Sequence, residues 1–209
     1  GDGEIFTRFT ASLSVIGHEL AHGVTQYTAG LVYRDQSGAL NESISDVFGA
    51  LVEQYSRGQT MADATWLIGE GIFTAEVEGS ALRSLRAPGT AYDDDVLGKD
   101  PQPAHFDDYI QTDEDGGGVH LNSGIPNRAF YLVAESLGGN AWERAGQIWY
   151  DAINGPTLTA RADFAQFAAA TVAAARERYG AQSAEVAAVI DGWTGVGIPA
   201  LPPQVAGST

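Results

Sequence analysis

The sequence predicts a mainly α-helical protein, a bundle of helices interrupted by one long irregular insertion. Apolar residues recur at helical spacing in two windows near the N-terminus and in further windows after residue 122. Between them, residues 76–118 are rich in Gly, Pro and Asp and show no such period. No segment repeats another, so we expect a helical domain and not a repeat array.

Length and charge narrow the classes of function. The 209 residues suit one domain, or at most two small ones, and 44% of them are apolar, enough for a core. The net charge of −16 would repel phosphate backbones, so nucleic acid is not an expected partner. No window is long and apolar enough for a membrane span, and the first residues do not resemble a signal peptide. Cysteine is absent, which leaves His, Asp and Glu as possible metal ligands.

The first half of the chain predicts two long helices joined by a short connection. The first helix is expected over about residues 10–28, ending at Gly30, a usual helix stop. Residues 31–33 are expected to be extended and 36–38 to form a turn. The second helix is expected over 39–55. Its apolar side chains form one core stripe: Leu40, Ile44, Val47, Phe48, Leu51, Val52 and Tyr55.

The second half predicts the insertion and then a run of helices. An apolar segment of undetermined structure, 65–72, leads into the irregular stretch 76–118, which contains the acidic clusters 93–95 and 113–115. So long an irregular stretch within a compact domain is usually functional or binds ions. The remaining helices are expected over about 122–137, 141–154, 161–179 and 183–193. Prolines mark about 199–209 as a loose tail.

The first helix carries the most informative motif in the chain, His-Glu-x-x-His. His18 and His22 are four residues apart and lie on one helical face, so both can bind the same metal ion. Glu19 lies about 100° around the helix, beside the metal and not on it, where a general base would stand. The plainer alternative is two unrelated histidines with a solvated glutamate between them, because short motifs recur by accident.

The second helix offers a third ligand. A catalytic zinc takes three protein ligands and keeps a fourth position open. Antiparallel packing of the first two helices would bring Glu42 against the histidine pair, and Asp46, one turn later, could accept the free ring N–H of a ligand histidine. The alternative is a solvated acidic face that also includes Glu53.

Taken together, these motifs resemble the thermolysin family of zinc metallopeptidases, the gluzincins. The resemblance rests on His-Glu-Leu-Ala-His at 18–22 and Asn-Glu-Ser-Ile-Ser-Asp at 41–46. It extends through residues 27–33 and 116–125 and reaches the last helix, so it covers nearly the whole chain. It implies that residues 1–209 form the catalytic C-terminal helical domain of such an enzyme.

The resemblance implies a zinc site and a hydrolytic mechanism. His18, His22 and Glu42 would bind one zinc ion. Glu19 would take a proton from the zinc-bound water and later deliver it to the leaving amine, while Asp46 would hold His18 from behind. The implied activity is zinc-dependent endopeptidase activity on peptides or proteins, with preference for a bulky apolar residue after the cut. Family membership also implies a secreted, extracellular enzyme.

Other positions are matched to roles around the substrate. Tyr33 and His120 would donate hydrogen bonds to the oxyanion, Asp115 would orient His120, and Arg83 would bind a backbone carbonyl of the substrate. The plainer alternatives are a core aromatic for Tyr33, a loop histidine for His120 and a surface ion pair for Arg83. The matched walls of an apolar substrate pocket are Phe6, Phe9, Val15, Ile68, Ile72 and Leu82.

One departure from the family concerns calcium. Glu53 and Glu70 stand at two acidic positions of the family's paired calcium site. Three other positions hold residues without a carboxylate: Ser14, Thr65 and Leu67. Two adjacent Ca²⁺ ions need many anionic oxygens, so we expect the double site to be lost. At most one weak cation site is expected, near Glu53, Asp63 and Glu70.

A second departure is the family's β-rich N-terminal domain, which has no counterpart in this chain. Without it, the zinc chemistry could persist while peptide binding fails, because positioning supplies about 7–11 kcal/mol of a barrier. The sequence therefore predicts either an active zinc endopeptidase domain or an isolated zinc-binding domain that is inactive until it associates with its N-terminal half. An acidic helical binding module with an incidental motif is the third reading, and it predicts no stoichiometric zinc.

Overall fold

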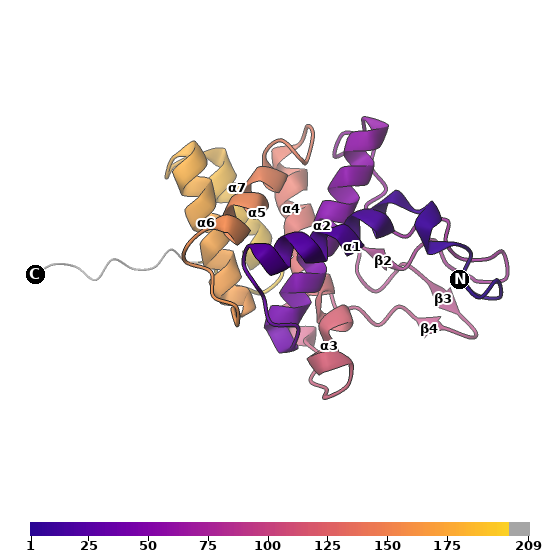
Figure 1. Ribbon diagram of the computed structural model, residues 1–209. Helices are drawn as coiled ribbons and strands as arrows, with labels where there is room; N and C mark the ends of the chain where they lie inside the picture. Colours follow the sequence, from indigo (N-terminus) through magenta and orange to yellow (C-terminus); the bar gives the residue numbers. More distant parts are fainter. Residues whose placement is uncertain (201–209) are drawn as a thin grey trace, which may run out of the picture.

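The computed structural model describes residues 1–200 and confirms the mainly helical fold class. Figure 1 shows helices α4–α7 gathered at one end, the short strands at the other, and α1 and α2 crossing between them. The helices are α1 (Leu13–Tyr27), α2 (Asp35–Arg57), α3 (Asp115–Asn122), α4 (Gly124–Leu137), α5 (Ala145–Asn154), α6 (Phe164–Tyr179) and α7 (Ala184–Thr194), with the 3-10 turns η1 (Phe9–Ala11) and η2 (Phe106–Asp108). Within this range, no helix is long and apolar enough to cross a bilayer. Most of the expected tail, 201–209, lies outside the described residues.

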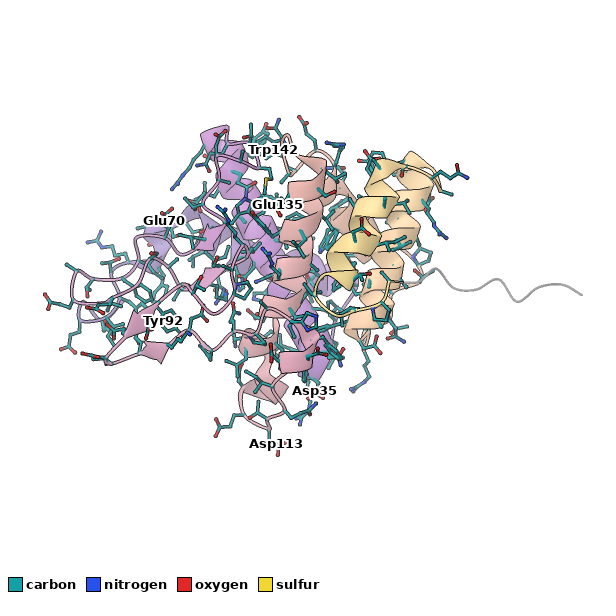
Figure 2. All side chains as sticks on the ribbon, turned by 180° about the vertical axis from the view of Figure 1, so that it is seen from behind. Asp35, Glu70, Tyr92, Asp113, Glu135 and Trp142 are labelled. Atoms are coloured by element: carbon teal, nitrogen blue, oxygen red, sulfur yellow. The ribbon has the colours of Figure 1, made fainter. Side chains whose placement is uncertain are left out.

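Helix α2 begins four residues earlier than the sequence suggested, and the predicted turn at 36–38 is wrong. The Gly38 N–H donates to the Arg34 carbonyl at 2.9 Å, a helical bond. Gly38 serves close packing instead, since a Cβ there would lie 2.4 Å from Val119 Cγ1. The extra turn makes α2 span the molecule. In Figure 2, Asp35 at its start lies near Asp113 at the bottom, and Trp142 lies at the top.

Other boundaries shift for local reasons. Helix α6 starts at Phe164 and not near residue 161, because Asp163 caps it through a reciprocal capping box with Gln166. Helix α5 starts at Ala145, and residues 141–144 form a turn before it. Helix α1 starts at Leu13, after the separate 3-10 turn η1.

Helices α1 and α2 touch backbone to backbone where they cross. A Cβ on Gly17 would lie 2.9 Å from Gly49 Cα, and a Cβ on Gly49 would lie 2.3 Å from the Ser14 carbonyl oxygen. These two glycines let the helix axes approach more closely than larger side chains would allow. The close crossing brings the histidine face of α1 directly onto the carboxylate face of α2.

The main core lies between α2 and the helices α4–α7. Trp149 of α5 and Trp193 of α7 stack with ring centroids 6.0 Å apart, and Phe167 meets both rings edge-on. The Trp193 indole N–H donates to Thr171 Oγ1 at 2.9 Å, so its polar atom is satisfied inside the core. This packed end of the bundle fixes α2 and α4 as the rigid supports of the residues described below.

The long irregular insertion is confirmed by the structure. Two small antiparallel hairpins interrupt it: β1 (Leu67–Ile68) with β2 (Arg83–Ser84), and β3 (Asp93–Asp94) with β4 (Gly98–Lys99). Aspartates hold its loops, since Asp94 accepts three backbone N–H bonds and Asp100 accepts three more. The insertion runs into α3, whose first residue is Asp115, but Gly116, Gly117 and Gly118 have positive, non-helical φ, so the regular part of the helix begins after residue 118, as expected.

Candidate metal and catalytic site

Three predicted ligands converge where α1 crosses α2. His18 Nε2 and His22 Nε2 are 3.1 Å apart, and each lies 3.4 Å from an oxygen of Glu42. Zinc bonds of about 2.0–2.1 Å in a tetrahedron place neighbouring ligand atoms about 3.3 Å apart. The spacing of these three side chains therefore matches one tetrahedral ion. Within residues 1–200, this is the one group of three or more His, Asp or Glu side chains close enough to share a metal.

The chemistry of the donor set fits the same ion. Glu42 is 1% exposed, and its Oε2 is buried without a hydrogen-bond partner. A carboxylate oxygen left bare in this way is strongly destabilising unless a cation offsets it. Two imidazoles and one carboxylate, with no thiolate, form the donor set of a catalytic zinc site. Glu19, the expected general base, is an exposed residue of α1 next to His18.

Hydrogen bonds from behind orient both histidine rings. His18 Nδ1 donates to Asp46 Oδ1 at 2.8 Å, and His22 Nδ1 donates to Asn41 Oδ1 at 2.8 Å, with Ser45 Oγ at 3.1 Å. With the proton on Nδ1, each ring directs the Nε2 lone pair at the centre of the triad. Asn41 and Ser45 are missing from the sequence prediction, although they lie four residues apart on the same face of α2.

Asp46 is the hub behind the triad. The fully buried carboxylate also accepts Arg83 Nε at 2.8 Å and Arg83 Nη2 at 2.7 Å, and Asn127 Nδ2 at 2.9 Å. Burial alone would raise the pKa of Asp46, but the charge of Arg83 and the bonds from Arg83 and His18 hold it well below its usual value. In His18, burial has the opposite effect and would lower the pKa, yet the hydrogen bond to Asp46 and its charge outweigh burial and raise the pKa of His18.

The predicted substrate arginine is in contact with this hub. The side chain of Arg83 is 15% exposed and grips both Asp46 oxygens, so it is not a surface ion pair. Burial would lower the pKa of Arg83, but the adjacent Asp46 carboxylate raises it, which keeps the guanidinium charged. Neither Asn127 nor this use of Arg83 follows from the sequence, because both partners are far from Asp46 along the chain.

The two predicted oxyanion donors come together at the open side of the triad. The Tyr33 hydroxyl donates to Glu42 and lies 3.2 Å from His120 Nε2. His120 Nε2 is 3.5 Å from Glu42 Oε2, and His120 Nδ1 is 2.7 Å from Asp115 Oδ1. Partial burial and the bond to the Glu42 carboxylate raise the pKa of Tyr33, so the phenol keeps its proton. Tyr33 is about half exposed and is not a core aromatic.

His120 is held by its own backbone as well as its ring. It follows Gly116, Gly117 and Gly118, all with positive φ, of which Gly117 has no room for a Cβ. The His120 N–H donates to Asp115 Oδ2 at 2.9 Å, and Gln102 Nε2 donates to the His120 carbonyl at 2.6 Å. His120 therefore stands in an ordered turn of α3 and is not a free loop histidine.

The expected walls of the substrate pocket are mostly packed in this structure. Val15 is buried, and the Phe6 ring lies 5.2 Å from the ring of Phe9 at a tilt of 36°; Phe9 is exposed. Ile68 and Ile72 are fully buried, while Leu82 is half-buried. A cavity of about 540 Å³ lies beside the triad instead. It is lined by His22, Gln26, Gly30, Leu31, Tyr33 and Asn41.

The carboxylates expected to form at most one weak cation site lie close to an arginine side chain. Arg57 Nη2 lies 2.5 Å from Glu53 Oε1, and Arg57 Nη1 lies 4.0 Å from Glu70 Oε2. The Asp63 carboxylate accepts the Thr60 hydroxyl at 2.6 Å. The guanidinium thus offsets part of the carboxylate charge in this region, and the loss of the double calcium site stays a prediction.

Comparison with known proteins agrees with this geometry. A family model described as "Thermolysin metallopeptidase, alpha-helical domain" matches residues 29–198. The chain is 55% identical over 198 residues to an "Extracellular metalloprotease" of Pectobacterium carotovorum subsp. carotovorum and 50% identical over 200 residues to "Protease PrtS" of Photorhabdus sp.. It covers 56% and 53% of those relatives, and 95% of this chain is matched in each case.

A solved structure matches in three dimensions. The precursor of protealysin, a metalloproteinase from Serratia proteamaculans, superposes with a TM-score of 0.92 at 60% sequence identity. The match covers 95% of this chain and 61% of that one. The chain therefore spans a little over half the length of these relatives.

Proposed function

Because the chain belongs to the thermolysin family of metallopeptidases, we propose that it is the zinc-binding, catalytic helical domain of an endopeptidase. The observation that carries the proposal is the convergence of His18, His22 and Glu42 at 3.1–3.4 Å, with a bare Glu42 oxygen at the centre. His18, His22 and Glu42 would hold the ion. Bound zinc would act there as a Lewis acid that polarises a carbonyl and lowers the pKa of water.

Glu19 is proposed as the general base. It is adjacent to the ligand His18, is exposed on α1 and is not part of the triad. It would accept a proton from the attacking water and return that proton to the leaving amine, so that the peptide C–N bond breaks without releasing an unstable anion.

Tyr33 and His120 would stabilise the oxyanion that forms when water attacks the carbonyl. Their polar atoms are 3.2 Å apart, so both can reach one oxygen. Asp115 accepts a hydrogen bond from His120 Nδ1 and so orients the ring with Nε2 toward Tyr33; as an imidazolium, the ring would donate from Nε2 to the oxyanion. Each such donor typically contributes about 3 kcal/mol to transition-state stabilisation.

We propose that residues next to Asp46 select the substrate. Arg83 would bind a substrate carbonyl with the part of its guanidinium that Asp46 does not use. Leu82, half-buried beside Arg83, would contact a bulky apolar residue after the cut, together with Val15 and Phe6. Support for this preference comes from family resemblance and from the apolar character of these positions.

An exposed apolar face on α1 supports a second domain as partner. Leu20 is 71% exposed, and Ile16 and Val24 continue its stripe along the helix. Together with Val52 and Tyr150 they line an apolar cavity of about 330 Å³. Monomeric proteins rarely leave such a surface uncovered. We propose that the remaining part of the longer, extracellular relatives covers an equivalent face, and that an extracellular enzyme of this kind needs that cover for full activity.

Variants of two neighbouring carboxylates test the function. Glu19→Gln should keep zinc but abolish cleavage of a peptide with an apolar residue after the scissile bond. Glu42→Ala should lose both zinc and cleavage, whereas Glu143→Gln, a distant carboxylate before α5, should change neither. The assay is run on the chain alone and after adding the N-terminal part of a close relative. Undiminished cleavage by Glu19→Gln would refute the mechanism.

The alternative of an inactive zinc-binding domain is favoured by the same exposed α1 face. It predicts zinc binding without cleavage by the chain alone, and cleavage only in the mixture. Zinc binding without cleavage in either assay would contradict both the endopeptidase and this alternative.

A further inference from the structure

Asn127 of α4 is a buried polar residue with no part in the proposed mechanism. Its side chain is fully buried and donates from Nδ2 to Asp46 Oδ2 at 2.9 Å. Asp46 lies on α2, 81 residues earlier, so this bond ties two helices of the core together. The other end of the amide, Oδ1, is buried as well and has no hydrogen-bond partner among the described residues.

The unpaired Oδ1 argues against a role in stability alone. A buried acceptor without a partner destabilises the fold, and an apolar side chain of the same shape would remove that defect. Asn122 provides the contrast within this chain. It is equally buried, but it uses both ends of its amide, donating to the Ile110 carbonyl at 3.0 Å and accepting the Ile110 N–H at 2.9 Å.

The single bond of Asn127 adds a hold from α4 on the direction of the Asp46 carboxylate, which Arg83 also holds. Oδ1 of Asp46 accepts from His18 and Arg83, while Oδ2 accepts from Arg83 and Asn127. Rotation of the carboxyl group about its Cβ–Cγ bond would strain the Asn127 bond on the Oδ2 side together with the bonds to Arg83 and His18. Holding Oδ2 from α4 therefore holds the direction in which Oδ1 accepts His18 Nδ1, and with it the aim of His18 Nε2.

We propose that Asn127 is a positioning residue for the metal ligand His18, acting through Asp46. The inference rests on the proposed function, since the aim of His18 matters only if this ring binds zinc. Loss of a partner behind a ligand histidine typically weakens metal binding about 10–100-fold. Because Asn127 acts through one intervening carboxylate, we expect the lower end, a loss of about tenfold.

The test measures zinc affinity and thermal stability on the same samples. Asn127→Leu removes the donor and the unpaired acceptor together while keeping the branched shape of the side chain. Asn122→Leu is the matched control, because it removes a fully paired buried asparagine that does not touch the hub. Zinc dissociation constants come from competition with a chelator, and Tm is measured on the zinc-free chains. If Asn127→Leu does not fold, Asn127→Ala, which also lacks both the donor and the unpaired acceptor, replaces it.

The two asparagine variants should differ in which quantity they lower, zinc affinity or Tm. Asn127→Leu should bind zinc about tenfold more weakly with a Tm close to that of the wild type, whereas Asn122→Leu should lower Tm and keep the wild-type zinc affinity. Unchanged zinc affinity in the Asn127 variants, or an equal loss of affinity in both asparagine variants, would overturn the inference. A wild-type chain that binds no zinc would overturn the proposed function, and this inference with it.

Discussion

The crossing of α1 and α2 predicts a sharp asymmetry between two glycine substitutions. Gly49→Ala places a Cβ 2.3 Å from the Ser14 carbonyl oxygen and 3.1 Å from the His18 backbone nitrogen. Ordinary contact begins at 3.4 Å, so α1 must withdraw by about 1 Å. The obstructing atom is backbone and cannot rotate away, so the overpacking cost lies near the upper end of the usual range, about 3 kcal/mol.

Helix propensity offsets part of that cost. Alanine is favoured over glycine by about 1 kcal/mol in a helix interior, so Gly49→Ala should destabilise the fold by a net of about 2 kcal/mol. Gly23→Ala is the matched control, because a Cβ on Gly23 of the same helix pair meets nothing within 4 Å. It should stabilise the fold by up to about 1 kcal/mol.

Urea unfolding of the three chains at neutral pH measures both effects, with zinc affinity as a second readout. Withdrawal of α1 carries His18 and His22 away from Glu42, so Gly49→Ala should also bind zinc more weakly, while Gly23→Ala should bind it normally. A Gly49→Ala chain as stable as Gly23→Ala would refute the close helix crossing.

Three further changes test other parts of the structure. Chelation of calcium in zinc-replete buffer should leave Tm unchanged, because Arg57 already neutralises Glu53 and lies near Glu70; a fall of several degrees would contradict this. Three backbone N–H bonds lower the pKa of Asp94 from the usual 3.8. Its contribution to stability is therefore full above that value and is lost as pH falls through the lower folded-state pKa. The difference in urea stability between wild type and Asp94→Asn should accordingly be large at pH 7 and shrink below about pH 3.8. Asp163→Ala should destabilise α6 by about 1 kcal/mol without changing zinc affinity, and a larger loss than Gly49→Ala would contradict the assignment of the cap.

The convergence of His18, His22 and Glu42 could be predicted because its signal is local. His18 and His22 share one helical face, and Glu42 and Asp46 share a face of the next helix, four residues apart in each case. Helical periodicity fixes such pairs before any tertiary contact is known. Family resemblance then added His120, which the structure brings to the same place through an unusual run of three left-handed glycines.

The remaining features depend on contacts that no local pattern carries. Asn127 and Gln102 lie in segments of ordinary composition, and their hydrogen bonds run to residues far along the chain. The 36–38 segment resembles a turn, yet Gly38 is required by the approach of Val119 from α3. Arg83 was matched to the substrate, and only its position against Asp46 shows that it also holds the site together.

The central claim is that His18, His22 and Glu42 together bind one zinc ion. The direct measurement is zinc content per chain after equilibrium dialysis against trace zinc, on the wild type, Glu42→Ala and the control Glu143→Gln. The account predicts close to one zinc per chain for the wild type and the control, and a sharp loss for Glu42→Ala. No bound zinc in the wild type, or full retention in Glu42→Ala, would contradict it.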